Sequence, residues 1–349
     1  MNPIREVYFD CAASAPVLRS VREMLGAWQY ANPNAVHSPG RDARGDLEQA
    51  RKAIARCINA EPEEIYFTPS ATSACRSAVE LLEIGNCSAH EHKAVSDACL
   101  AQRVSRRESL SFAHILASNE TGEIFTKDVG KAASTGIPVF TDATAAMGHI
   151  PIDVKKLGVA ALAAGGHKFG APPGIGFLYV RNGVAEYKIS ERDFSYPGTP
   201  PVALALALAS ALEYRTSGRI YESLAYMHSQ QSQLAAALLG IPGAHINCMG
   251  KPRLPNILSV RFDGVNAREL LTLMDVNGVY ASAGSACHAE DDQPSAALLA
   301  AGLTEEQARS TIRLSWCEET PPEDFDFAAG VIADCVERLR TLGGIPMPR

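Results

Sequence analysis

The sequence predicts a two-domain α/β protein, in which a larger domain with a mainly parallel sheet is joined to a smaller α+β domain. Through the first two-thirds of the chain, short apolar runs alternate with helical stretches, as in strand–helix–strand units. The pattern changes near residue 245, where strands and helices become mixed. The length of 349 residues is sufficient for two domains, each with its own core.

The larger domain contains several apolar runs that are bounded by polar or turn-forming residues. These runs predict strands over residues 64–68, 110–116, 137–140 and 174–180. Helices are predicted over residues 75–83 and 127–135, between these strands. An alanine- and leucine-rich stretch follows Pro201, and a helix over residues 221–239 stops at the helix-ending pair Gly240 and Pro242.

The smaller domain follows, with a strand in ILSVRF, a helix in ARELLTLMD, a short strand in VYASA and two further helices. The predicted boundaries place residues 14–244 in the large domain, and residues 1–13 and 245–349 in the small one. No internal repeat or low-complexity linker interrupts this plan.

Composition narrows the class of protein. Apolar residues make up 46% and charged residues 20% of the chain, as in ordinary globular proteins. The net charge of −7 gives no reason to expect direct binding to nucleic acid or an anionic membrane. The sequence contains no apolar run of about 18 residues and no signal-peptide pattern at its start, so no membrane span is expected. Nine scattered cysteines without a C-x-x-C pair argue against a disulfide framework and favour the cytoplasm.

A lysine in a glycine-rich turn, Lys168 in GGHKFG, is the first candidate for chemistry. Taken alone, such a lysine is more often a solvated surface charge. Asp142 ends the predicted strand IPVFTD, at the edge of an α/β sheet where ligands bind. A carboxylate there suits the ring nitrogen of pyridoxal 5'-phosphate (PLP), because a protonated ring withdraws electrons from the substrate. The alternative for Asp142 is a helix cap or turn.

Two further motifs lie between strands and helices. The turn over residues 70–73 precedes a helix, whose first N–H groups can bind a phosphate with help from the Thr72 hydroxyl. Simple N-capping is the alternative. His92 in EHKA opens another helix, where an imidazole could cover an aromatic ring and move protons near neutral pH.

Taken together and in this order, the motifs resemble the class V aminotransferase family and, within it, the cysteine desulfurases. The resemblance runs almost from end to end, through YFDCAASAP, ANPNAVHSPGRDAR, EIYFTPSATSA, EHKAVSDAC, SNETGEI, FTDATAAMGHIPIDV, GGHKFGAPPGIGFLYVR, YPGTPPVALA, LPNILSVRF, SAGSACHAE and STIRLSW. It implies the PLP-dependent transferase fold (fold type I, aspartate aminotransferase-like) for the large domain.

The resemblance also implies roles for individual residues. Lys168 binds PLP covalently, Asp142 pairs with the ring nitrogen, His92 stacks on the ring and Asn119 lies near the ring hydroxyl. Thr72 and His167 hold the phosphate. Thr199 in PGT matches the residue that reaches the phosphate of a neighbouring subunit, which implies a homodimer.

Cys287, in GSACHAEDDQPS, matches the nucleophilic cysteine of the family. The length of its polar segment suggests the subgroup that passes persulfide sulfur to an acceptor protein. A buried or incidental thiol is the alternative, and the acids nearby argue against burial. Arg313 matches the residue that binds the substrate carboxylate through a planar guanidinium fork, whereas an ordinary interdomain ion pair is its structural alternative.

The chain departs from the family pattern at two positions near the expected cofactor. Ala145 replaces a glutamine that hydrogen-bonds the ring hydroxyl, and Gly165 replaces a serine that binds phosphate. The stretch between Arg181 and Gly198 is also shorter than usual and lacks a glycine-, histidine- and arginine-rich segment. These changes predict altered ring electronics or weaker cofactor binding.

The function predicted from this resemblance is a PLP-dependent cysteine desulfurase. It would convert L-cysteine to L-alanine, place the sulfur on Cys287 as a persulfide and transfer it to an acceptor. Two alternatives remain at this point. One is another class V reaction, such as C–S or C–Se lysis, and the other is a degenerate homologue that serves a sulfur-transfer assembly. No metal ligand set is predicted.

Overall fold

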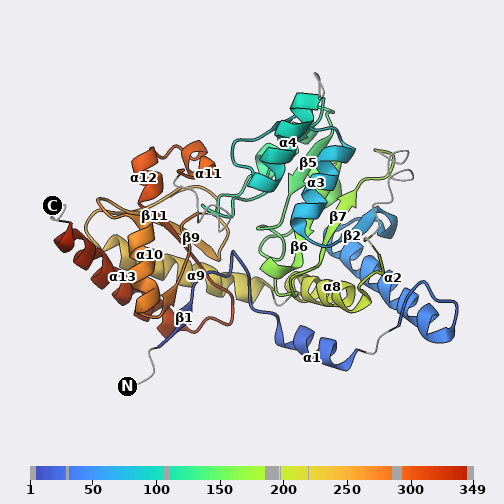
Figure 1. The fold of residues 1–349 in the computed structure, drawn as a ribbon, viewed down its shortest axis with the longest axis horizontal. Coiled ribbons are helices and arrows are strands. Elements are labelled where there is room, and N and C mark those ends of the chain that lie inside the picture. The colour runs from blue at the N-terminus through green and yellow to red at the C-terminus, as the bar shows by residue number, and fades with distance from the viewer. Residues whose placement is uncertain are drawn as a thin grey trace. The chain divides into compact units, whose positions relative to one another are not determined.

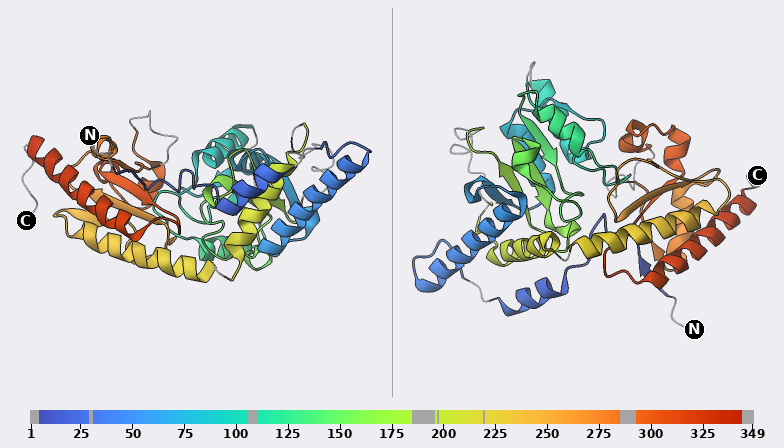
Figure 2. Two further views of the ribbon diagram at one scale, coloured as in Figure 1. Left: turned by 90° about the horizontal axis from the view of Figure 1, so that it is seen from below. Right: turned by 180° about the vertical axis from the view of Figure 1, so that it is seen from behind.

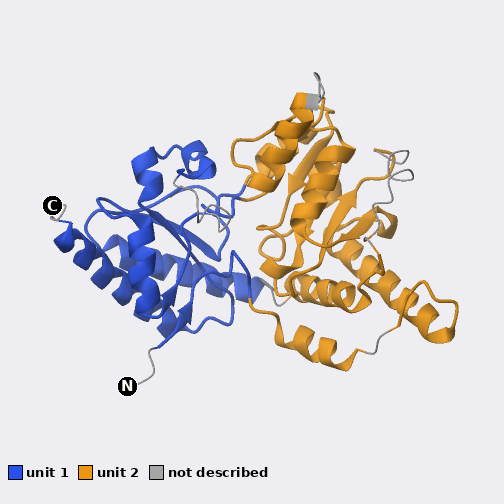
Figure 3. Ribbon diagram, viewed as in Figure 1, with its two compact units in different colours: residues 1–15, 118–124, 221–349 blue, residues 16–117, 125–220 orange. Residues whose placement is uncertain are grey.

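The structure is a computed structural model that describes residues 5–28, 31–105, 110–184, 196, 198–218, 220–284 and 293–343. The chain divides into two compact units (Figure 3). Unit 1 comprises Met1–Ala15, Ser118–Ile124 and Tyr221–Arg349, whereas unit 2 comprises Pro16–Ala117 and Phe125–Ile220. The predicted domain boundaries at 14–244 and 245–349 stay a prediction, because compactness does not test which parts fold independently.

Unit 2 is built on a six-stranded sheet (Figure 1). Its strand order is β2 (Ile65–Thr68), β7 (Gly176–Val180), β6 (Ala161–Gly165), β5 (Val139–Asp142), β4 (Phe112–Ala113) and β3 (Asn86–Cys87). β3 to β6 pair in parallel, and β7 is antiparallel to both of its neighbours. β2 therefore points the same way as β3 to β6, so their carboxyl ends share one edge of the sheet.

The central strands β5, β6 and β7 are buried along their whole length, as expected for a sheet covered on both faces. Helices α3 (Ala71–Leu81) and α4 (Lys93–Ser105) pack on one face through small side chains such as Ala74, Ala78 and Cys99. These small residues let the helices approach the sheet closely.

The remaining helices of unit 2 are α1 (Arg19–Ala27), α2 (Ser38–Ile58), α5 (Thr126–Ala133), α6 (Val154–Leu157) and α8 (Val202–Thr216). α2 packs along α8, and the views in Figure 2 show the two helices side by side. Two short 3₁₀ turns complete the unit, η1 (Pro62–Glu64) and η2 (Gly166–Lys168).

Unit 1 contains a three-stranded antiparallel sheet in the order β11 (Thr311–Ser315), β9 (Ile257–Phe262) and β8 (Ala244–Ile246). A parallel pair joins β1 (Val7–Tyr8) to β10 (Val279–Tyr280). The helices are α9 (Ile220–Leu239), α10 (Ala267–Val276), α11 (Ala296–Ala300), α12 (Glu305–Arg309) and α13 (Pro322–Leu342).

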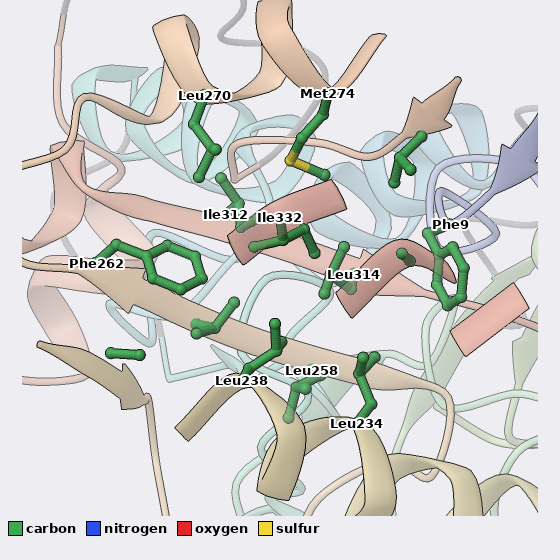
Figure 4. Close-up of a cluster of buried hydrophobic side chains, with 14 of the residues drawn as sticks. Phe9, Leu234, Leu238, Leu258, Phe262, Leu270, Met274, Ile312, Leu314 and Ile332 are labelled. Carbon is green, nitrogen blue, oxygen red and sulfur yellow. The ribbon is translucent and has the colours of Figure 1, made fainter. Parts of the chain in front are cut away.

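The two faces of the unit 1 sheet differ in polarity. Alternate residues of β9 and β11 contribute to an apolar core with α9, α10 and α13, which includes Leu258, Phe262, Ile312 and Leu314 (Figure 4). On the other face, four residues of these strands are polar and also buried: Ser259, Thr311, Arg313 and Ser315. Buried polar side chains need partners, so this second face is the one that can carry a polar site.

The structure confirms the predicted α/β class, with a mixed rather than a purely parallel sheet. Most of the predicted elements exist with shifted ends: α3 starts at Ala71 rather than at residue 75, and β4 is restricted to Phe112–Ala113 within the predicted 110–116. Strands β1, β3, β6, β8 and β11 were not predicted. In the described part of the chain, no helix is long and apolar enough to cross a membrane.

Candidate functional site

Three of the motifs singled out in the sequence leave the unit 2 sheet at the same edge. Asp142 is the last residue of β5, and its register partner Ala163 lies near the end of the parallel strand β6. The turn η2, which ends at Lys168, follows β6 directly. The helix α3 follows β2, which ends at this edge as well. The topology therefore brings Asp142, Lys168 and the start of α3 to the carboxyl edge of one sheet.

The first turn of α3 lies directly against the ends of β6 and β7. A Cβ atom on Gly176 would stand 2.6 Å from the Ala164 carbonyl oxygen and 3.2 Å from the Ala71 nitrogen. A Cβ atom on Gly165 would stand 2.9 Å from the Ala71 Cβ. Glycine at both positions is what allows this close approach, and it leaves the helix N-terminus beside main chain rather than side chains.

The hydroxyl groups of Ser70 and Thr72 in this turn have different roles. Ser70 is the N-cap of α3, and its Oγ accepts a hydrogen bond of 3.1 Å from the Ser73 nitrogen. The Ser70 and Ser73 Oγ atoms are also 3.0 Å apart. The capping predicted as the plain alternative is thus present, carried by Ser70. Thr72 is half-buried on the first turn, the position from which a hydroxyl and free N–H groups can meet an anion.

Asp142 is buried, with 6% of its surface exposed. Its Oδ1 accepts a hydrogen bond of 2.9 Å from the Thr144 nitrogen. Burial, and then the charge of the neighbouring Asp142, raises the pKa of the Cys75 thiol of α3 well above its usual value. Cys75 therefore stays a protonated thiol beside the carboxylate.

The main chain around Lys168 is held by two buried side chains that the sequence did not single out. The His149 ring nitrogen Nε2 lies 3.3 Å from the Lys168 carbonyl oxygen, which can only accept, so Nε2 donates. Arg215 Nε donates to the Phe169 carbonyl oxygen at 3.1 Å. Both residues come from elsewhere in unit 2, and their role became visible only with the fold.

Both histidines close to Lys168 are neutral near pH 7. Burial, reinforced by the Arg215 charge, lowers the pKa of His149 to about 3. Burial and the Lys168 charge lower the pKa of His167 to about 4. Neutral imidazoles do not compete with a lysine for a negatively charged ligand, but they can still donate one hydrogen bond each.

His92 stands at the same sheet edge, since it follows β3 and precedes α4. Its Nδ1 accepts a hydrogen bond of 3.1 Å from the Ala94 nitrogen, which fixes the orientation of the half-buried ring. The preceding residue, Glu91, is buried and accepts hydrogen bonds from Ser88 Oγ and from the Ile115 nitrogen. Burial and then the Asp142 charge raise the pKa of Glu91 well above its usual value, which favours the protonated acid.

Two other predicted residues, Asn119 and Arg313, lie together in unit 1. Arg313 Nη1 donates to the Asn119 carbonyl oxygen at 2.9 Å, and Nη2 lies 2.6 Å from Asp10 Oδ1. Among the described residues, the buried Nε has no hydrogen-bond partner. Arg313 therefore forms an ion pair, as the structural alternative predicted, but both partners lie within unit 1. The predicted contact with a substrate carboxylate is not tested.

The last two predicted residues are placed less fully. Thr199 is exposed in this single chain. Cys287 lies within residues 285–292, outside the described residues. Among the residues that the structure describes, no group of three His, Cys, Asp or Glu side chains is arranged to hold a metal ion.

The two departures from the family pattern are both accommodated by packing. Ala145 is buried, with 7% of its surface exposed. At residue 165 a serine would bring its Cβ into the 2.9 Å approach to Ala71, so α3 would have to shift. The close packing of α3 against the end of β6 therefore depends on the glycine at residue 165.

Comparison with known proteins identifies the family. The sequence profile of the Aminotransferase class-V family matches residues 7–98 and 91–327. The chain belongs to this family. Among its relatives, a cysteine desulfurase IscS from Methanosarcina thermophila is 30% identical over 379 aligned positions, which cover 97% of this chain and 94% of the relative. The predicted family is therefore confirmed over nearly the whole length.

Solved structures of family members agree with the fold. A NifS-like protein has a TM-score of 0.85 and 26% identity, and the match covers 96% of this chain and 100% of that one. A structure described as SspA in complex with cysteine has a TM-score of 0.74 and 28% identity, covering 90% and 99% of the two chains.

Proposed function

We propose that this chain is a PLP-dependent cysteine desulfurase, which converts L-cysteine to L-alanine and places the sulfur on Cys287 as a persulfide. The observation that carries the proposal is the meeting of Lys168, Asp142 and the first turn of α3 at one sheet edge. This edge belongs to a class V family fold whose relatives of nearly equal length are cysteine desulfurases.

The residues at this edge fit PLP. The seat formed by Gly165, Gly176 and the N-terminus of α3 offers main-chain N–H groups and the Thr72 hydroxyl to a phosphate. His167 can donate to the same group as a neutral imidazole. The buried carboxylate of Asp142 suits the protonated ring nitrogen, His92 suits the ring face and Lys168 the aldehyde carbon. When bound, PLP supplies an electron sink for charge at the substrate Cα.

The chain's own residues then have distinct tasks. Asp142 holds the proton at the ring nitrogen, and the Lys168 amine takes the proton from the substrate Cα. His149 and Arg215 keep the main chain of Lys168 and Phe169 in place while this side chain moves. Arg313 and Asn119 are proposed to orient the substrate carboxylate and the ring hydroxyl.

Cys287 is proposed to act as the nucleophile. Its thiolate attacks the substrate sulfur, so that an S–S bond forms while the Cβ–S bond of the substrate breaks. The electron pair from the broken bond remains on the Cβ carbon, which takes up a proton on the way to alanine. The persulfide sulfur then passes to an acceptor protein.

The assembly that we propose is a homodimer in the cytoplasm. Thr199 is exposed in the single chain, as needed if it reaches the phosphate in a partner subunit. All eight cysteines that the structure describes are free thiols, which is the state that a reducing compartment maintains.

One competing reaction has an observation in its favour. Ala145 offers no hydrogen bond to the ring hydroxyl, and a changed ring environment can redirect PLP chemistry toward C–S or C–Se lysis. A lyase would release pyruvate from L-cysteine, whereas the desulfurase yields alanine and a persulfide.

The deciding experiment is intact mass spectrometry of the PLP-loaded protein after addition of L-cysteine, together with quantification of alanine and pyruvate. We expect a gain of one or more sulfur atoms and formation of alanine. Both should be lost in Cys287→Ala but retained in Cys248→Ala, a matched control at a half-buried cysteine. Pyruvate without a persulfide would reassign the reaction to a lyase.

A further inference from the structure

Glu120 lies in the segment Ser118–Ile124, whose backbone is fixed by hydrogen bonds within the segment and to a neighbouring stretch of unit 1. Ser118 Oγ accepts hydrogen bonds from the nitrogens of Glu120 and Thr121, at 3.2 and 3.1 Å. The segment is then joined to a neighbouring stretch of unit 1 by main-chain hydrogen bonds from Leu254 to Gly122 and from Ile124 to Pro252. Glu120 itself is buried, with 5% of its surface exposed.

From this fixed backbone, one carboxylate oxygen reaches two residues that are distant from it in sequence. Ser295 Oγ donates to Glu120 Oε2 at 2.5 Å. A Cβ atom on Gly284 would lie 2.9 Å from the same oxygen, and Gly284 has a φ of +67°. Glycine is thus required there by its left-handed backbone and favoured by the approach of the carboxylate.

The direction of the Ser295 hydrogen bond is settled by a second contact. Ser295 is the N-cap of α11, and its Oγ accepts a hydrogen bond of 3.3 Å from the Leu298 nitrogen. Its single hydroxyl proton is therefore directed to Glu120, which must accept. A hydrogen bond to an ionised carboxylate is roughly twice as strong as one between neutral groups.

Gly284 and Ser295 are the residues between which Cys287 lies in the sequence. We propose that Glu120 is a positioning residue, which anchors Ser295 on one side of the nucleophilic cysteine and lies against Gly284 on the other. The role assigned to Cys287 rests on the proposed function above.

The segment Ser118–Ile124 also contacts Arg313. It therefore contacts both elements that are proposed to act on the substrate, Arg313 and the residues that flank the Cys287 segment. The neighbouring Asn119 carbonyl oxygen accepts from Arg313 Nη1. The Arg313 main chain exchanges hydrogen bonds with Ser282, two residues before Gly284. Apart from Asn119, the residues proposed to bind the cofactor lie in unit 2, so loss of the Glu120 carboxylate should affect sulfur transfer more than PLP affinity.

The test compares the parent with Glu120→Ala, Glu120→Gln and the control Glu123→Ala, all as full chains loaded with PLP. Glu123 is a buried glutamate of the same segment, but its carboxylate pairs with Lys251. The first measurement is the rate of Cys287 alkylation by iodoacetamide without substrate, followed by peptide mass spectrometry with the half-buried Cys57 of unit 2 as an internal reference. The second is the kcat for alanine formation, and the third is PLP affinity by absorbance titration.

In Glu120→Ala we expect kcat to fall about tenfold, as expected for loss of a charge-assisted hydrogen bond. The rate of Cys287 alkylation should change relative to Cys57, and PLP affinity should change less than kcat. Glu120→Gln keeps an acceptor oxygen and should recover part of kcat. If Glu120→Ala is unstable, Glu120→Gln and Ser295→Ala supply the same comparison.

Equal alkylation rates in Glu120→Ala, Glu123→Ala and the parent would overturn the positioning role. The proposed function fails in a different way, since it is refuted if the parent itself forms neither alanine nor a persulfide. Alkylation requires no substrate, so its comparison remains decisive in that case.

Discussion

Burial controls the protonation of four side chains around the proposed cofactor site. It raises the pKa of the Glu91 carboxyl and the Cys75 thiol, and it lowers the pKa of His149 and His167. Each shift favours the neutral form of its group. A polar lining without added charge lets Asp142 and Lys168 determine how the site interacts with a ligand.

Glu91 gives a prediction about pH. Its pKa is above the usual 4.5 in the folded state, so the folded protein binds more protons than the unfolded chain once the pH exceeds that value. The contribution of Glu91 to stability is therefore present at low pH and decreases as the pH rises toward the folded-state pKa. In Glu91→Gln this decrease should disappear.

The measurement is the free energy of urea unfolding at several values between pH 5 and pH 8. The difference between Glu91→Gln and the parent should grow in favour of the variant as the pH rises. Glu337→Gln, at an exposed position on α13, should show no such trend. A constant difference across the pH range would contradict protonation of buried Glu91.

Two ion pairs of equal length test the effect of burial on Arg313. Arg313–Asp10 and Arg5–Asp324 both measure 2.6 Å, but the arginine side chains are 2% and 44% exposed, respectively. Asp10→Asn leaves a buried guanidinium without its counter-charge and should lower the free energy of unfolding by about 3 kcal/mol. Asp324→Asn should lower it by about 1 kcal/mol or less. Equal losses in urea unfolding would show that burial does not distinguish the pairs.

At the scale of elements, the seat of α3 on β6 and β7 depends on glycine. Gly176→Ala forces a Cβ atom to within 2.6 Å of the Ala164 carbonyl oxygen and should lower the free energy of unfolding by about 1–3 kcal/mol. The same Cβ atom would stand 3.1 Å from the Ser70 carbonyl carbon and 3.2 Å from the Ala71 nitrogen, so the start of α3 must also give way and PLP affinity should fall as well. Gly130→Ala in α5 is the matched control, since a Cβ atom there meets nothing within 4 Å.

Thermal unfolding and absorbance titration with PLP provide the two measurements. Gly130→Ala should be neutral or stabilise the protein by about 0.5–1 kcal/mol, because alanine favours a helix over glycine. PLP affinity that is unchanged in Gly176→Ala would argue against the phosphate seat at the start of α3.

Helices and strands could be predicted from the sequence where the residue types of a segment match its burial in the fold. The runs that become β2, β7 and β9 are rich in aromatic and β-branched residues, which favour strands. Strand β6 has the sequence ALAAG, which alone resembles a helix, and only its pairing with β5 and β7 makes it a strand. Strand β11 alternates polar and apolar residues in TIRLS, which is the pattern of a half-buried strand, so a signal for it was present in the sequence.

The same division applies to the site. Lys168 and Asp142 could be predicted because their roles depend on residue type and on local strand ends. Glu91, Glu120 and His149 could not, because each acts through a contact with a segment distant in sequence. For Glu120 this partner is Ser295, 175 residues further along the chain. Such pairings require the fold.

For the whole molecule, we expect a homodimer. Light scattering coupled to size exclusion should give a mass of twice the 37.2 kDa of one chain. If Thr199 serves the phosphate of the partner subunit, Thr199→Ala should weaken PLP binding without changing the mass. A monomer with full PLP affinity would contradict this arrangement. The control is Thr216→Ala, which changes a threonine at the end of α8.

The composition of unit 1 has a consequence for how the chain is made. Unit 1 joins Met1–Ala15 to Ser118–Ile124 and Tyr221–Arg349, and β1 pairs with β10 more than 270 residues later. During synthesis β1 leaves the ribosome well before its partner strand β10, which is more than 270 residues further along the chain. Most of unit 2 can therefore fold early, while β1 remains unpaired until β10 has been synthesised. A chain that stops before β10 leaves this strand open to pairing with other molecules.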